Sequence, residues 1–156
     1  MPVKGLNDNA VAASVAELNA RLADMIALRL ALKQAHWNVK GPNFIGIHEL
    51  FDVAHGRLAG HEDTIAERVQ ILGGVALGTL EAVAGAVTVE AYPTDLVADR
   101  DHVAAISGRM AALGEKVRGA IETVSDAGDE GTMDIFVGLS RALDKDLWFI
   151  ESHLGG

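Results

Sequence analysis

Apolar residues recur every three or four positions through four long stretches of the chain, which is the spacing of an amphipathic α-helix. The first predicted helix covers residues 9–36 and is rich in alanine and leucine. It stops at Gly41-Pro42, because glycine tolerates a left-handed turn and proline cannot continue the helical hydrogen bonds. The second begins near Asn43, a suitable N-cap, and ends at Gly73-Gly74. A short turn therefore joins these two helices.

Two further helices follow a long connection, in which a short helix is expected around residues 80–84. Tyr92-Pro93-Thr94 ends this connection, and Thr94 is the expected N-cap of the third helix. The apolar positions of the third helix alternate in steps of three and four: Val103, Ile106, Met110, Leu113, Val117, Ala120 and Val124. A turn over residues 126–131 leads to the fourth helix, whose apolar face consists of Phe136, Leu139, Leu143, Leu147, Ile150 and Leu154.

The order of these elements predicts an all-α protein. Two short links and one long crossover, between helices two and three, describe a four-helix bundle with ferritin-like connectivity. At 156 residues the chain fits one domain, which buries about 70% of the surface of the unfolded chain. We therefore expect a single domain over residues 1–156, with residues 1–8 as a short flexible tail.

The composition adds self-association and cation binding to this picture. Residues AVILMFWYC make up 49% of the chain, and 17 glycines come in addition. This exceeds the ~45–50% that is usual for a soluble domain when glycine is counted, so we expect the chain to bury surface against copies of itself. The formal charge of −9 repels nucleic acid at long range and favours cations as ligands.

The residue types restrict the chemistry and the location. The sequence contains no cysteine, so imidazole and carboxylate groups would have to hold any transition metal, a donor set that suits iron or manganese and also accommodates zinc. The N-terminal MPVKGLNDNA lacks the apolar core of a signal peptide, which predicts a cytoplasmic protein. Residues 71–89 are almost apolar enough to span a bilayer, but Glu81 and four glycines favour a loop with a short helix, and no membrane association is expected.

Polar residues of the second predicted helix gather on a face of their own. With His48 at 0° on a helical wheel, Asp52, Asp63 and Glu67 fall at about 40°, 60° and 100°, and His55 falls at about −20°. The core stripe lies between about −120° and −60° and consists of Ile47, Phe51, Ala54, Leu58, Ile65, Val69 and Leu72. The polar face therefore points to the flank of the bundle.

The spacing within this face allows two interpretations. His48 and Asp52 are four residues apart, as are Asp63 and Glu67, so each pair can bind one ion from one side of the helix. Asp52 and Asp63, however, are about 16 Å apart along the axis, which metal–ligand bonds of about 2 Å do not bridge. Either there are two half-sites, or a second chain completes one site. We favour a two-fold dimer with antiparallel second helices, because homodimers are usually two-fold symmetric.

Ordinary structural roles remain open for all of these residues. His36 ends an apolar line on the first helix, and taken alone it is better explained as a buried, hydrogen-bonded core histidine. The acids fit a solvated helix face, and Trp37 and Trp148 fit simple packing. A di-iron site inside a bundle normally has Glu-x-x-His on two helices, and the sequence has no such motif. Spacing alone therefore leaves metal binding undecided.

Two motifs resemble the signature region of the Dps family, the bacterial mini-ferritins: HWNVKGPNFIGIHELFD at 36–52 and HEDTIAERVQILGG at 61–74. The resemblance continues through YPTD at 92–95 and LDKDLWFIES at 143–152, so it covers nearly the whole chain. It implies a ferritin-like bundle with a short helix in the crossover, assembled from two-fold dimers into a hollow homo-dodecamer. It also implies a set of ferroxidase ligands: His36, His48 and Asp52 from one subunit, and Asp63 and Glu67 from its two-fold mate.

The chemistry implied by this resemblance is the oxidation of Fe(II) to Fe(III), with hydrogen peroxide as the preferred oxidant. Storage of ferric mineral inside the shell would protect against oxidative stress, and zinc and manganese are expected competitors for iron. Trp37, next to His36, would take up stray oxidising equivalents. In related shells iron enters through acidic pores near the start of the last helix. The candidates here are Asp126, Asp129, Glu130 and Asp134, although an ordinary polar turn explains each of them as well.

The termini differ from those of DNA-binding members of the family, which commonly carry a mobile, lysine-rich tail. Here the N-terminal tail offers Lys4 against Asp8, and the C-terminal residues 154–156 include no lysine. Twelve copies would carry 12 × −9 = −108 formal charges, so we expect weak or absent DNA binding. A surface patch is the remaining candidate for DNA, formed by Lys33, Lys40, Arg57 and Arg68.

Two alternatives to an iron-oxidising shell follow from these observations. One is a nucleoid-associated, DNA-compacting protein for which iron binding is secondary, and the acidic tails count against it. The other is a helical scaffold in which the histidines and acids are purely structural. Assembly into a particle of about twelve times 16.4 kDa with peroxide-dependent iron loading would distinguish the iron-oxidising shell from both alternatives.

Overall fold

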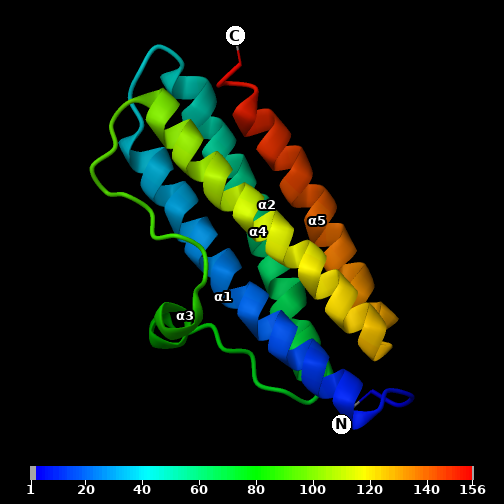
Figure 1. Ribbon diagram of the computed structural model, residues 1–156. Helices are drawn as coiled ribbons and strands as arrows, with labels where there is room; N and C mark the ends of the chain where they lie inside the picture. Colours follow the sequence, from blue (N-terminus) through cyan, green and yellow to red (C-terminus); the bar gives the residue numbers. More distant parts are fainter. Residues whose placement is uncertain (1–2, 156) are drawn as a thin grey trace.

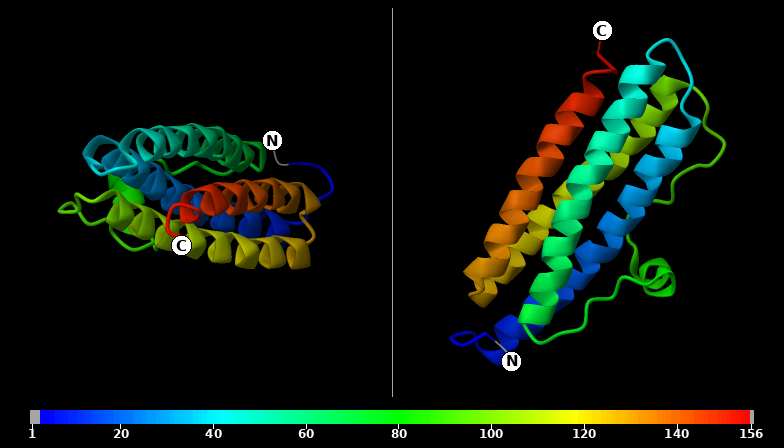
Figure 2. Two further views of the ribbon diagram at one scale, coloured as in Figure 1. Left: turned by 90° about the horizontal axis from the view of Figure 1, so that it is seen from above. Right: turned by 180° about the vertical axis from the view of Figure 1, so that it is seen from behind.

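The computed structural model describes residues 3–155 and contains five helices (Figure 1). Their bounds are α1 Asp8–Asn38, α2 Phe44–Ile71, α3 Leu80–Ala86, α4 Asp99–Ala127 and α5 Glu130–Glu151. The four long helices α1, α2, α4 and α5 lie side by side, and the short α3 lies outside them next to α1 (Figures 1 and 2). Apart from one bridge between Lys40 and Ala98, residues 3–155 contain no β-structure. The predicted all-α bundle with a short helix in the crossover is confirmed.

The apolar stripes predicted from the sequence form the core of this bundle. All seven core positions predicted on α2 are buried, with at most 1% of each side chain exposed, and the same holds for the seven on α4. On α5 the prediction is right for Phe136, Leu139, Leu143 and Ile150, whereas Leu147 is half-buried and Leu154 lies beyond the helix. Each large apolar side chain buried in this way stabilises the fold by about 1.5–3 kcal/mol.

The turn between α1 and α2 is held against the start of α4. The Lys40 N–H donates to the Val97 carbonyl oxygen (2.9 Å), and the Asp99 N–H donates to the Lys40 carbonyl oxygen (2.8 Å). Gly41 has a φ of +151°, and a Cβ atom there would lie 2.5 Å from the carboxyl carbon of Asp99. Glycine is therefore required at this position both by the backbone conformation and by the close approach of Asp99.

The predicted N-cap at Thr94 is wrong. α4 begins at Asp99 with Ala98 as its N-cap residue, and no side chain caps it. The bridge between Lys40 and Ala98 keeps the chain extended up to this point, and such a tertiary contact leaves no local mark in the sequence. Asp99 and Asp101 in the first turn instead favour the helix start through their negative charge.

The connection between α4 and α5 is shorter than predicted. The predicted turn covered residues 126–131, but α4 continues to Ala127 and α5 begins at Glu130. Gly128 adopts a left-handed conformation, with a φ of 90°, and ends α4. Asp129 then caps α5 at once, because its carboxylate accepts hydrogen bonds from the backbone N–H (3.0 Å) and the hydroxyl (2.6 Å) of Thr132.

Replacing Asp129 by alanine should lower the free energy of unfolding by about 2 kcal/mol, because it removes the α5 cap and leaves the Arg68 guanidinium, 2.8 Å away, without its partner. Burial alone would raise the pKa of Asp129, but hydrogen bonds from Thr132 and the charge of Arg68 hold that pKa below its usual value. A carboxylate with a lowered pKa stabilises the folded state above about pH 4 and loses this effect as the pH falls further.

The loss caused by Asp129→Ala, measured by urea denaturation, should therefore be complete at pH 7 and shrink below about pH 4. Asp134→Ala is the matched control, because Asp134 is an exposed carboxylate one turn further along α5. It should change the free energy of unfolding by less than about 0.5 kcal/mol. Equal losses for the two variants would contradict a capping role for Asp129.

The long crossover is anchored to α1 by Asp24, whose side chain is fully buried. The Asp24 carboxylate accepts hydrogen bonds from the N–H groups of Thr88 (2.6 Å) and Val89 (3.2 Å) and from the Thr88 hydroxyl (2.9 Å). It also pairs with Arg21 at 3.4 Å. Earlier in the crossover, the short helix expected at 80–84 is confirmed as α3, capped by Thr79. Among residues 3–155, no helix combines the length and the apolar character needed to cross a membrane.

The first turn of the described chain packs onto the bundle. Val3 and Leu6 are partly buried against the core. The side chain of Asn7 caps α1 by accepting a hydrogen bond from the Ala10 N–H (2.9 Å). Asp8, the last residue of the predicted tail, therefore belongs to the helix. Met1 and Pro2 lie outside the described residues, and the flexibility of the tail stays a prediction.

Candidate metal centre

The first group of candidate ligands lies where the C-terminal end of α1 meets the N-terminal end of α2. His36 belongs to the last turn of α1, and His48 to the second turn of α2. Their imidazole rings stack, with centroids 3.6 Å apart and planes inclined by 19°. The Nδ1 atom of each ring lies 2.7 Å from the backbone carbonyl oxygen of the other residue. The two histidines thus hold each other through a reciprocal pair of hydrogen bonds.

This reciprocal pair leaves the Nε2 atoms of both histidines free to bind metal. A carbonyl oxygen can only accept a hydrogen bond, so each Nδ1 carries the proton and each Nε2 of the neutral ring keeps a lone pair. Metal-binding histidines commonly donate their other N–H to a backbone carbonyl in this way. Both rings are half-buried rather than enclosed. The arrangement therefore fits a ligand pair better than a pair of core histidines.

Asp52 lies one turn after His48 on α2, is exposed, and forms an ion pair with Lys33 of α1. The hydrogen bond from Lys33 is the main cause that lowers the pKa of Asp52. Burial opposes it, and the charge of Lys33 adds to the lowering. The carboxylate is thus ionised at neutral pH. Together with the histidines it lines an open groove of about 390 Å³, whose walls are His36, Ile45, His48, Glu49, Asp52 and Val53.

Replacing Lys33 by glutamine should tighten the binding of a divalent cation at this groove by about two- to fivefold at low salt, because the cation no longer displaces an ammonium group from Asp52. Titration calorimetry with Zn²⁺, or with Fe(II) under anaerobic conditions, measures this change. The difference should shrink as the ionic strength rises. Lys40→Gln is the control, since Lys40 is exposed near the same end of α1 and forms no ion pair with a described carboxylate. Weaker binding by the Lys33 variant would instead mean that Lys33 positions Asp52 for the cation.

The second group of candidate ligands, Asp63 and Glu67, is exposed near the other end of the same helix. α2 is unbroken from Phe44 to Ile71, so the separation of about 16 Å between Asp52 and Asp63 holds. In the described part of a single chain, no three histidine, aspartate or glutamate side chains are arranged to hold an ion. One chain therefore brings His36, His48 and Asp52 to one end of α2 and leaves the other two at a distance.

A charged network that no sequence motif indicated lies between the two groups. Arg29 of α1 binds the Glu62 carboxylate through two hydrogen bonds, of 2.7 and 3.1 Å, and its guanidinium donates a third to Nε2 of His55 (3.2 Å). Burial, followed by the charge of Arg29, lowers the pKa of His55, so its ring is neutral at pH 7. Arg29 stands between Met25 and Leu32 in the apolar line of α1 that ends at His36. This interruption is the one sequence feature that could have revealed the network.

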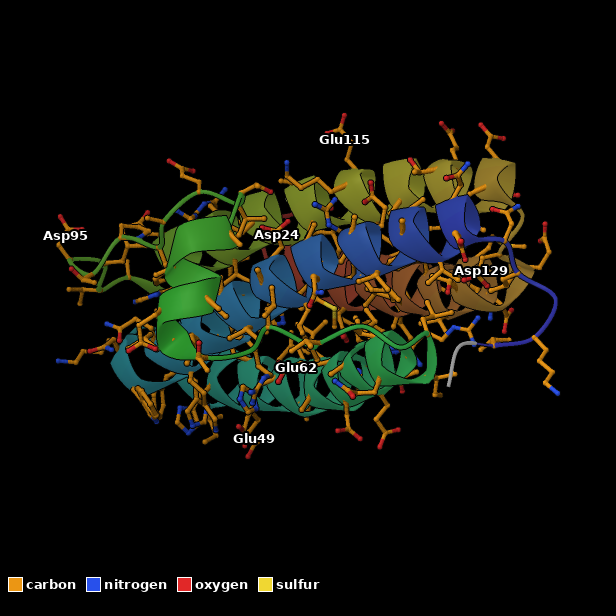
Figure 3. All side chains as sticks on the ribbon, turned by 90° about the horizontal axis from the view of Figure 1, so that it is seen from below. Asp24, Glu49, Glu62, Asp95, Glu115 and Asp129 are labelled. Atoms are coloured by element: carbon orange, nitrogen blue, oxygen red, sulfur yellow. The ribbon has the colours of Figure 1, made fainter. Side chains whose placement is uncertain are left out.

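The remaining candidates occupy two other places. Trp37 follows His36 and is 69% exposed, and Trp148 on α5 is 65% exposed, so neither side chain is explained by packing within this chain. Asp126, Glu130 and Asp134 are exposed around the α4–α5 connection. Asp129, labelled in Figure 3, is buried and already bound to Thr132 and Arg68. The exposed acids of this connection are therefore the three others.

Comparisons with known proteins agree with this fold. The family described as "Ferritin-like domain" matches residues 15–156. The DNA protection during starvation protein of Agrobacterium fabrum is 48% identical over 149 residues, which cover 96% of this chain and 92% of that protein. The protein of the same name from Mycolicibacterium smegmatis is 33% identical over 152 residues, covering 97% of this chain and 82% of that protein.

Solved structures give the same result. Mycobacterium smegmatis Dps superimposes with a TM-score of 0.96 at 32% identity, covering 100% of this chain and 89% of that chain. DpsA14 from Streptomyces coelicolor superimposes with a TM-score of 0.95 at 32% identity, covering 99% of this chain and 92% of that chain. The bundle with its capped crossover helix is thus that of a ferritin-like protein. Within this class the chain belongs to the Dps family, which the sequence motifs had predicted.

Proposed function

We propose that this chain is a ferroxidase and iron-storage protein. In this proposal it oxidises Fe(II) to Fe(III) with hydrogen peroxide at sites shared by two chains, and it stores the ferric product inside a hollow dodecamer. Membership of the Dps family supports a role connected with iron in general. The oxidant, the shared site, the dodecamer and a cytoplasmic location are the specific parts of the proposal.

The observation that carries the proposal is the reciprocal hydrogen bonding of His36 and His48. It presents two Nε2 lone pairs next to the ionised carboxylate of Asp52, in a groove open at the surface. Because these three groups alone are not arranged to hold an ion, the proposed site needs further oxygen donors. Asp63 and Glu67 lie at the other end of α2 and supply them if two α2 helices pair antiparallel about a two-fold axis. Ile45 and Val53, which are exposed beside the groove, would be covered by this pairing.

The proposed donors suit the chemistry. Imidazole and carboxylate bind Fe(II), and carboxylates favour the harder Fe(III) product. Two Fe(II) ions together supply the two electrons that reduce one hydrogen peroxide molecule, with two protons, to two water molecules. Because both electrons are delivered together, no hydroxyl radical is released. Trp37 beside His36 would accept a stray oxidising equivalent when a single electron is transferred. Asp126, Glu130 and Asp134 would attract incoming cations at the proposed pore.

DNA compaction is the alternative function, and the charges do not favour it. Three of the four cations of the candidate patch are already paired with carboxylates: Lys33 with Asp52, Arg57 with Asp146 and Arg68 with Asp129. With a formal charge of −9 per chain, a cluster of free cations for phosphate groups is lacking among the described residues. A plasmid gel shift at low salt and pH 7.5 should show no retardation, and retardation at that pH would support the alternative.

A crystal soaked in Fe(II) under anaerobic conditions tests the proposed site directly. Anomalous scattering should locate iron at a two-fold interface, within bonding distance of His36, His48 and Asp52 of one chain and Asp63 and Glu67 of the other. Size-exclusion chromatography should give a particle of about 12 × 16.4 kDa, or about 197 kDa. Iron bound within one chain, or a monomer that takes up no iron, would refute the proposal.

A further inference from the structure

A phenol and an imidazole outside the candidate metal centre form a closely bonded pair. Tyr92 lies in the crossover and His102 on α4, and the Tyr92 hydroxyl is 2.6 Å from Nδ1 of His102. His102 is only 1% exposed, and its Nε2 atom is buried without a hydrogen-bond partner among the described residues. Proton transfer within this pair requires the His102 tautomer that carries its proton on Nε2, in which the Tyr92 hydroxyl donates to Nδ1. The site described above makes no use of this pair.

The surroundings keep both groups neutral while the pair is at rest. Burial raises the pKa of Tyr92 to about 12 against the opposing charge of Arg109, so the phenol keeps its proton. Burial also lowers the pKa of His102, so the imidazole is neutral at rest and one ring nitrogen keeps a lone pair for a proton. This is the arrangement in which a phenol loses an electron and passes its proton to a neighbouring base in the same step.

Arg109 makes this transfer of the proton necessary. Its guanidinium carbon lies 5.2 Å from the centroid of the Tyr92 ring. Hydrogen bonds to the carbonyl oxygens of Ala105 (2.8 Å), Glu90 (3.0 Å) and Ala91 hold it there. A fixed positive charge over the ring disfavours a tyrosine radical cation. Oxidation of Tyr92 is therefore feasible only as the neutral radical. Once Tyr92 is reduced again, the proton returns from His102, because the pKa of the phenol lies far above that of the imidazole.

Tyr92 shares a groove with Trp37. The groove has a volume of about 380 Å³, and Trp37 and Tyr92 lie in its wall together with Ala27, Leu30, Ala31, Gln34 and Thr94. Figure 1 shows the part of the crossover after α3 running along α1 toward the C-terminal end of α1. Trp37 therefore has His36 as its neighbour in the chain and Tyr92 as its neighbour across the groove. The chain contains no other tyrosine and one other tryptophan.

We propose that Tyr92 and His102 form a redox pair that takes an oxidising equivalent from Trp37 and holds it away from the candidate metal centre. One electron passes from the Tyr92 phenol to the indole radical cation of Trp37, which becomes neutral again. The phenolic proton moves to Nδ1 of His102, which leaves a neutral tyrosyl radical and an imidazolium. The supply of that equivalent by Fe(II) and hydrogen peroxide rests on the proposed function, but the transfer itself does not.

Flash photolysis tests the transfer in the metal-free, assembled protein. Photogenerated tris(bipyridine)ruthenium(III) is a soluble one-electron oxidant that attacks exposed indoles and requires no iron. The wild type should form a tyrosyl radical, recognised by its absorbance and its EPR spectrum, and Tyr92→Phe should abolish it. Trp37→Phe should lower the tyrosyl yield about tenfold. Trp148→Phe is the matched control, because Trp148 is 65% exposed against 69% for Trp37, and it should leave the yield unchanged. A yield that is independent of Trp37 would overturn the proposal.

The role of His102 is tested by the rate of tyrosyl formation. His102→Gln should retain the Trp37 radical and slow its conversion to the tyrosyl radical about tenfold. Should this buried substitution prevent folding, the wild type in D₂O provides the test, because a coupled proton transfer is slower for deuterium. Equal rates in H₂O and D₂O would rule out His102 as proton acceptor. If the flash experiment succeeds and iron oxidation is absent, the proposed function fails while the redox pair stands.

Discussion

Two inactive variants of this chain should recover about a quarter of the wild-type rate of iron oxidation when they are co-assembled. One variant, His48→Ala with Asp52→Ala, lacks the ligands at the first end of α2, and the other, Asp63→Ala with Glu67→Ala, lacks those at the second end. Each alone should lose activity about a hundredfold or more, because even residues that only support a ligand cost up to about 100-fold. In a mixed dimer one of the two shared sites combines both intact halves. Random pairing makes half of the dimers mixed, so about a quarter of all sites are intact.

The measurement is stopped-flow oxidation of Fe(II) by hydrogen peroxide, after the variants are dissociated together and reassembled. The matched control mixes His48→Ala chains with Asp52→Ala chains, which damage the same half and cannot complement each other. That mixture should stay as inactive as its parents. If instead each end of α2 bound and oxidised iron by itself, each double variant would keep about half of the activity and mixing would change nothing. This outcome would exclude a shared site.

Asp24→Ala should cost about 3–5 kcal/mol of folding free energy, although Asp24 is not one of the proposed ligands. The substitution leaves the N–H groups of Thr88 and Val89 without an acceptor and the buried Arg21 without its partner. Hydrogen exchange should locate the damage, because the amides of Thr88 and Val89 should lose their protection before those of the bundle core. The loss of stability itself is measured by urea denaturation.

Asp95→Ala is the control for this substitution. Asp95 lies in the same crossover and also carries a carboxylate, but it is exposed and points away from the bundle (Figure 3). Its removal should change the free energy of unfolding by less than about 0.5 kcal/mol. If Asp24→Ala were equally mild, the crossover would be held mainly by its apolar contacts, and the buried carboxylate would contribute little.

The sequence predicted those features that depend on periodicity within one helix. The core stripe of α2 and the separate polar face that carries His48, Asp52, Asp63 and Glu67 follow from the rise and rotation per residue. The connectivity of the bundle follows from the lengths of the links. The same geometry predicts that a single chain keeps the two ligand groups apart, and the unbroken α2 agrees with this prediction.

The features that escaped prediction all depend on contacts between distant parts of the chain. Thr94 was a reasonable cap locally, but the pairing of Lys40 with residues 97–99 decides where α4 starts. The pairing of Lys33 with Asp52 and the network around Arg29 require the rotation of α1 relative to α2, which no periodicity specifies. Asp129 looked like one more exposed acid in a polar turn, and its burial depends on its contact with Arg68 of α2.

The reciprocal hydrogen bonds of His36 and His48 also determine which piece of the protein can carry the half-site. α2 alone contains four of the five candidate ligands, yet the proton on His48 Nδ1 is held by a carbonyl oxygen of α1. The spacing of the two helix ends depends in turn on the Gly41 turn, which rests against Asp99 of α4. A transplanted α2 helix would therefore carry the right residues with their imidazoles free to rotate and to change tautomer. The half-site therefore depends on the region where the end of α1, the start of α2 and the start of α4 meet. Any redesign that transfers this centre to another protein has to include all three segments.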